Sequence, residues 1–159
     1  MKRILVIVGL CVSAAVAKAQ TNTDEIALLQ ASYGLEKKQI VTQYMKITDA
    51  ESSAFWKEYD MYEAERKELG KKRISIITDY ANNANNLSDA KATELMKSTL
   101  DLYISFAKLQ EKTFNKMSKV ITPVRAAQFI QLEVYLENVV RMEISDQIPM
   151  IGELEKTHK

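Results

Sequence analysis

Very few residues in this sequence can form a tight turn. One of the four glycines lies in the first 19 residues, so the rest of the chain holds three glycines and two prolines. Residues that lose little freedom in a helix, such as Ala, Leu, Glu, Lys, Gln and Met, are abundant instead. Sheets and barrels need many turns between short strands. The sequence therefore predicts an all-α protein with a few long helices.

Residues 1–19 have the pattern of a secretory signal peptide. A basic start at Met1–Arg3 precedes an apolar run from Ile4 to Ala17, and Ala17-Lys18-Ala19 supplies a small-x-small cleavage site. The apolar run is short for a helix that spans a bilayer. A retained membrane helix is the alternative, but we expect cleavage after Ala19 and export to the periplasm.

Removal of residues 1–19 changes the charge of the remaining chain. The full sequence has 22 basic and 21 acidic residues, and three of the basic ones lie in the first 19, which leaves 19 against 21 and a net charge of −2. A nucleic-acid-binding domain normally has a clear basic excess, so this class is not expected. The only cysteine, Cys11, is also removed, and we expect neither a disulfide nor a thiolate site.

Capping residues predict where the helices begin. Thr48 to Glu51 reads as a capping box, Ser88 is an N-cap, and Thr122 is a cap followed by Pro123 at the first helical position. The predicted helices are about 24–46, 49–80, 89–120 and 123–145. A polar break at Asn82–Asn86 separates the second from the third, and a polar tail occupies residues 148–159. The helical domain is thus residues 20–147.

Apolar residues recur at helical spacing in each predicted helix. In the first they are Ile26, Leu29, Tyr33, Ile40 and Tyr44. In the second they are Phe55, Tyr59, Tyr62, Leu69, Ile76 and Tyr80. In the third helix and just beyond it they are Met96, Leu100, Tyr103, Ala107, Phe114, Met117 and Ile121.

The predicted helix lengths imply an elongated shape. A helix of about 32 residues is about 48 Å long, whereas a compact domain of this size is about 37 Å across. We therefore expect an elongated bundle of about four helices, built around a long hairpin of the second and third. Such a bundle leaves apolar faces uncovered, which a second chain or another partner would cover, and we expect the protein to be an elongated homodimer.

Two short motifs resemble those of a known family. The run Lys46–Glu51 is similar to the first LTxxQ element of the periplasmic Spy/CpxP-like stress proteins, and Ser118–Phe129 is similar to the second. The order of signal peptide, motif, long helix, break, long helix, motif and last helix is also similar, over about residues 40–145. The positions that carry the motifs are Ile47, Thr48, Glu51, Ile121, Thr122, Pro123 and Arg125.

The chain departs from the family pattern at the motif glutamines. Glu51 replaces the first and keeps the capping-box chemistry, whereas Arg125 replaces the second and does not. Ile47 and Ile121 replace the leucines but preserve an apolar residue before each cap. We interpret both motifs mainly as markers of the fold, because capping explains the residue types directly.

The resemblance implies two functions for this chain. One is an ATP-independent chaperone that holds unfolded or partly folded proteins on an amphipathic helical surface, and the other is a regulatory protein that binds an envelope stress sensor domain. Some relatives bind metals, but His158 is the only histidine here, and carboxylates alone suit hard cations. No motif for an enzyme or for a nucleotide is present, and we expect no cofactor.

The segment from Phe55 to Arg73 is the predicted client-binding surface. Aromatic residues at helical spacing are combined there with basic residues. The aromatic side chains offer adaptable contacts to an unfolded chain, and we expect the basic side chains to attract its acidic segments. Core packing is the alternative explanation for the aromatic residues. The candidate residues are Phe55, Trp56, Tyr59, Tyr62, Arg66, Lys72 and Arg73.

Overall fold

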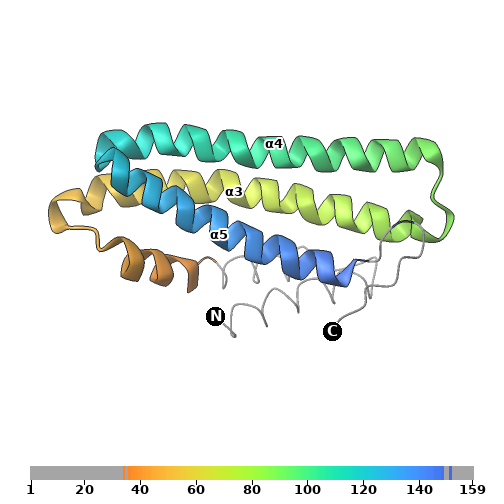
Figure 1. Cartoon of the computed structure of the whole chain (residues 1–159), viewed down its shortest axis with the longest axis horizontal. Helices are drawn as coiled ribbons and strands as arrows, with labels where there is room; N and C mark the ends of the chain where they lie inside the picture. The colour runs from red at the N-terminus through yellow and green to blue at the C-terminus, as the bar shows by residue number, and fades with distance from the viewer. Residues whose placement is uncertain (1–33, 35, 149–150, 152–159) are drawn as a thin grey trace.

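A computed structural model describes residues 34, 36–148 and 151 (Figure 1). Three long helices make up most of this part, numbered as in Figure 1: α3 (Asp49–Asn83), α4 (Asp89–Val120) and α5 (Pro123–Gln147). A short 3₁₀ turn, η1 (Ala84–Asn86), joins α3 to α4, and residues 36–45 are also helical. The described residues contain no strand, which confirms the all-α prediction.

Helices α3 and α4 form the predicted long hairpin. They contain 35 and 32 residues and lie side by side along the length of the molecule, with η1 at one end (Figure 1). Helix α5 begins beside the last turn of α4 and then diverges from it, so its C-terminal half lies apart from α4 (Figure 1). Among the described helices, none is long and apolar enough to cross a membrane.

Capping explains most of the helix boundaries. The Ser88 hydroxyl accepts a hydrogen bond from the Lys91 amide at 3.3 Å, and the Thr122 hydroxyl accepts one from the Arg125 amide at 3.4 Å. Pro123 follows at the first position of α5, where its missing N–H leaves no bond unmade. The predicted starts of α3, α4 and α5 are therefore confirmed.

The predicted end of α3 is three residues too early. Asn83 is the last residue of the helix, and its side-chain amide donates to the carbonyl of Asp79 at 2.7 Å and to the Asp79 carboxylate at 3.0 Å. An asparagine side chain can compete with a helix, but here it bonds one turn back and supports the last turn. The break is therefore confined to residues 84–88.

The core lies at the end of the bundle where α4 passes into α5. Phe129 of α5 packs edge-on against Phe55 and Tyr62 of α3, with ring centroids 5.7 and 5.8 Å apart, a geometry that aromatic pairs prefer. Aliphatic side chains from residues 36–45, from α4 and its C-terminal cap, and from α5 complete this core. They are Val41, Met45, Leu109, Met117, Ile121 and Ala126.

The apolar stripe identified in the first predicted helix does not coincide with the buried face where the structure describes it. Tyr44 is exposed and Ile40 is half-buried, whereas the neighbouring Val41 and Met45 are buried. Both sets have helical spacing and lie on adjacent faces, so periodicity alone does not choose between them. The predicted positions before residue 34 lie outside the described residues, as do the signal peptide and His158.

The predicted face of α4 is correct only in its second half. Met117 and Ile121 are buried as expected, but the buried positions in the first half are Leu95, Leu102, Phe106 and Leu109. The predicted residues Met96, Leu100, Tyr103 and Ala107 are exposed. Helix α4 carries apolar side chains on two neighbouring faces, and only one face packs against α3. The other face remains open.

Candidate functional site: an open apolar groove

The structure places the predicted aromatic client surface inside the protein. Phe55, Tyr59 and Tyr62 are at most 3% exposed and belong to the core. Trp56 is half-buried, and its ring lies 4.8 Å from the Lys38 ammonium. The core-packing explanation is therefore correct for Phe55, Tyr59 and Tyr62, because a client cannot reach these side chains in this arrangement.

The predicted basic patch is also largely neutralised. Arg66 donates to both carboxylate oxygens of Glu63, at 2.9 and 3.1 Å, and Arg73 forms an ion pair with Glu137. Lys72 is the only exposed member of the three. These residues do not combine into a basic surface, because helix α5 and a neighbouring turn of α3 supply acidic partners that the sequence pattern did not reveal.

A buried ionic cluster lies beside the aromatic core. Lys37, only 1% exposed, forms ion pairs with Glu63 of α3 and with Glu133 of α5, the latter at 2.5 Å. The Tyr62 hydroxyl donates to the same Glu133 oxygen at 2.7 Å. One ammonium group thus joins residues 36–45 to both α3 and α5. Sequence periodicity did not reveal this cluster, because charged residues normally lie on the solvated face of a helix.

The pKa values of the two carboxylates in this cluster shift in opposite directions. Burial raises the pKa of Glu133, and the charge of Lys37 only partly opposes this effect. Burial also acts to raise the pKa of Glu63, but the charges of Lys37 and Arg66 outweigh it, so the pKa of Glu63 is lowered. Burial and the Glu133 charge raise the pKa of Tyr62 well above its usual value. Lys37 is the group that forms ion pairs with both buried carboxylates of the cluster.

The two motifs contact each other at the closed end of the bundle. The Glu51 carboxylate accepts from the Thr48 amide at 3.1 Å and from its hydroxyl at 2.8 Å, as part of the predicted capping box. The same carboxylate forms an ion pair with Arg125, and Arg125 also donates to the carbonyl of Met45 at 2.9 Å. The hydrogen bond from Arg125 is the largest reason why the pKa of Glu51 falls to about 2.

This contact gives the two charged motif residues a structural role. Glu51 and Arg125 occupy the two positions where the motifs normally have glutamine, and together they form an ion pair between α3 and α5. Ile121 is buried and Ile47 packs against the core. The motif residues therefore connect helix ends in this structure, in agreement with their interpretation as markers of the fold.

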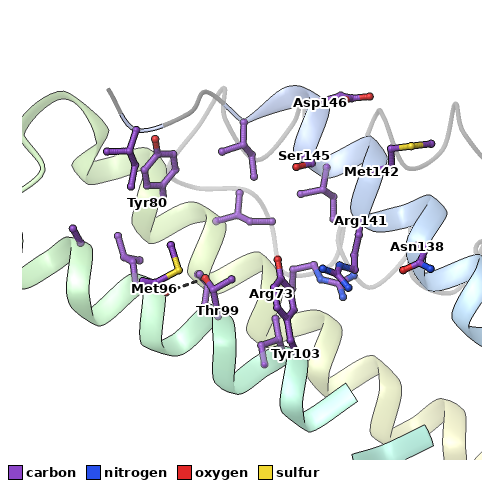
Figure 2. A pocket seen from close by; sticks show the side chains of 18 residues that line it. Arg73, Tyr80, Met96, Thr99, Tyr103, Asn138, Arg141, Met142, Ser145 and Asp146 are labelled. Atoms are coloured by element: carbon purple, nitrogen blue, oxygen red, sulfur yellow. Dashed lines mark hydrogen bonds between the residues drawn. The ribbon is translucent and has the colours of Figure 1, made fainter. Parts of the chain in front are cut away.

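A groove lies at the opposite end of the bundle. Helix α5 diverges from α4 there, and an open space of about 700 Å³ remains between α3, α4 and α5 (Figure 2). This volume is typical of ligand-binding pockets. The apolar lining comes from all three helices and the residues after α5, and includes Ile76, Ile77, Leu95, Met96, Leu102, Met142, Ile144, Ile148 and Ile151.

Two methionines form opposite edges of this groove. Met96 of α4 is 52% exposed and Met142 of α5 is 60% exposed, and Figure 2 shows them on the two sides of the pocket. Methionine is flexible and polarizable, so it can contact apolar groups of many shapes. Leu100 and Ile104 extend the exposed apolar surface along α4 beyond the groove.

Helix α5 gives the groove a more polar wall. Asn138, Arg141 and Ser145 lie at helical spacing on α5 and line the space opposite the apolar side chains of α3 and α4 (Figure 2). An amphipathic chain could bind along such a surface, with its apolar side toward α3 and α4. In the part of the chain that the structure describes, no three His, Cys, Asp or Glu side chains converge to bind a metal ion.

The groove had a partial signal in the sequence. Met96, Leu100 and Tyr103 form an apolar stripe in the sequence, but the stripe alone does not show whether these side chains are buried or line a groove, because that depends on the path of α5. In comparisons with known proteins, no family model, curated protein or solved structure matches this chain. The resemblance to the Spy/CpxP-like family therefore rests on the two motifs and their order.

Proposed function

We propose that this protein is a periplasmic, ATP-independent chaperone-like protein of the Spy/CpxP-like type, and that it binds unfolded segments in the groove between α3, α4 and α5. The observation that carries this proposal is the exposure of Met96 and Met142 on opposite edges of an apolar space of about 700 Å³. Large contiguous apolar surfaces of a folded protein often mark binding sites.

The properties of the groove favour many weakly selected clients over a single tight one. Its edges are flexible methionines, aliphatic side chains line much of it, and α5 adds an exposed polar wall. Such a surface adapts to different apolar sequences. Binding and release without ATP require only that the contact be weak, and a small, open apolar surface satisfies this condition.

A light-scattering assay tests this function. The protein without residues 1–19 should suppress aggregation of a denatured client at equimolar ratio and without nucleotide. Met96→Lys and Met142→Lys should each weaken the protection, because they place a charge at the edge of the apolar space. Both side chains are more than half exposed, so these substitutions should leave the fold intact.

Met61→Lys provides the matched control. Met61 is exposed on α3 outside the groove, so the same change there should leave protection unaltered. Absence of protection by the unsubstituted protein at every ratio would refute the chaperone proposal. In that case the alternative of a regulatory partner is tested by binding to isolated envelope sensor domains. Equal loss in all three variants would show that the groove is not the client surface.

A further inference from the structure

Two arginines line the groove, and only one of them is neutralised. Arg73 forms an ion pair with Glu137, and its guanidinium lies 4.7 Å from the ring centroid of Phe106. Arg141 is exposed, and its guanidinium lies 4.1 Å from the ring centroid of Tyr103. Among the described residues, no carboxylate forms an ion pair with Arg141. One end of the groove therefore carries an uncompensated positive charge.

The position of this charge is defined by the side chains around it. Figure 2 shows Arg73 and Arg141 converging beside Tyr103 at one end of the pocket, while Asp146 lies at the other end. With Glu137 opposing Arg73, the end near Tyr103 retains one net positive charge. The apolar side chains of Ile76, Ile77 and Leu95 lie between the two ends of the groove.

We propose that the groove selects polypeptide segments in which an aspartate or glutamate lies close to apolar residues, and that Arg141 binds this carboxylate. The inference rests on the proposed function and names the class of segment that the groove accepts. An arginine fork matches a carboxylate in a bidentate geometry. Stacking on Tyr103 holds the guanidinium plane before binding, so less side-chain freedom is lost when the ligand arrives.

This assignment differs from the one that the sequence predicted. The sequence placed the attraction for acidic segments at Arg66, Lys72 and Arg73 of α3, whereas the first and last of these have carboxylate partners. Arg141 on α5 is a better candidate because it combines exposure, a fixed orientation and a position next to the apolar lining. Arg141 is then a residue that determines specificity.

A matched pair of fluorescent peptides tests the proposal by anisotropy titration. Both are short, unstructured and rich in leucine, and they differ only in a central glutamate or glutamine. The unsubstituted protein should bind the glutamate peptide about fivefold more tightly, the effect expected of a part-exposed ion pair. Arg141→Gln should abolish this preference without preventing binding, and Arg141→Lys should retain part of it.

Lys97→Gln is the control for a general charge effect. Lys97 is exposed on α4 and does not line the groove, so its replacement should leave the preference intact. Equal binding of the two peptides, unchanged in Arg141→Gln, would overturn the inference while the proposed function stands. Binding of neither peptide would overturn both. Dodecanoate is tested in the same way. If the protein binds dodecanoate but neither peptide, and Arg141→Gln abolishes this binding, the ligand is a small hydrophobic carboxylate and the assignment of peptide segments is wrong.

Discussion

Replacement of Lys37 by methionine should strongly destabilise the protein. Methionine has a similar length, but it removes the ammonium that neutralises two buried carboxylates. Glu63 retains Arg66 as a partner, whereas Glu133 retains only the Tyr62 hydroxyl among the described residues. The other oxygen of Glu133 is buried and has no hydrogen-bond partner among them. The variant therefore leaves a nearly unpaired charge in the core.

The size of the effect follows from this burial. Lys37 and Glu133 are each only 1% exposed, and loss of one partner from a buried ion pair costs about 3–5 kcal/mol. Total stabilities of small proteins are about 5–15 kcal/mol, so the loss is a large fraction. With a denaturant dependence of about 2 kcal/mol per molar urea, the unfolding midpoint should fall by about 1.5–2.5 M.

The effect should also depend on pH. Without Lys37, the pKa of Glu133 in the folded protein rises further above its value in the unfolded chain. A raised pKa stabilises the fold at low pH, and this contribution is lost as the pH rises through the folded value. The destabilisation by Lys37→Met should therefore be larger at pH 8 than at pH 5, and it should be reduced in the double variant Lys37→Met/Glu133→Gln.

Urea unfolding followed by circular dichroism at 222 nm measures these changes. Lys38→Met is the matched control, because the Lys38 ammonium is 3.5 Å from the exposed Asp60 carboxylate and both side chains are largely solvated. Such a pair contributes about 0.2–1 kcal/mol. If Lys37→Met is no more destabilising than Lys38→Met, the buried ionic cluster does not hold residues 36–45 to α3 and α5 as described.

The remaining predictions concern the two motifs. Thr48→Ala and Thr122→Ala should each cost about 1 kcal/mol in urea unfolding, because each removes a hydroxyl from a helix start, and both variants should bind clients normally. Glu51→Gln should remove a contribution to stability that is present above pH 4.5 and is lost as the pH falls toward 2, since the folded pKa of Glu51 is about 2. In thermal unfolding from pH 7 to 2, the unfolding temperatures of the unsubstituted protein and of Glu51→Gln should converge at acid pH. Arg125→Glu should destabilise, and the exchange Glu51→Arg/Arg125→Glu should recover less than the ion pair contributes, because the capping-box carboxylate is lost as well.

The hairpin could be predicted because its signals are local. Scarce turn residues, the caps at Thr48, Ser88 and Thr122, and the polar break after α3 each depend on residues close in sequence. The end of α3 at Asn83 is the exception. The side-chain bond from Asn83 to Asp79 is also local, but it supports the last turn of the helix, whereas asparagine side chains usually compete with a helix. Local chemistry therefore locates a boundary to within a few residues and leaves the last turn undecided.

The candidate site could not be predicted because it depends on the path of α5. The divergence of α5 from α4 exposes Met96 and Tyr103, which belong to an apolar stripe of the sequence, and its early turns bury Tyr62 against Phe129. A partner distant in sequence, Glu137, also neutralises Arg73, whereas the partner of Arg66 is Glu63, one turn away in α3. A periodic pattern identifies apolar and charged faces, but the choice of which face is covered is made by tertiary packing.

Site-specific photo-crosslinking tests most directly whether unfolded chains bind in the groove. A photoreactive phenylalanine derivative replaces Met96 or Met142 at the edges of the groove, or Met61 outside it, and each protein is irradiated with a denatured client. We expect abundant crosslinks from positions 96 and 142 and few from position 61. Crosslinking at position 61 that equals or exceeds that at the other two would contradict the assignment of the groove as the client-binding site.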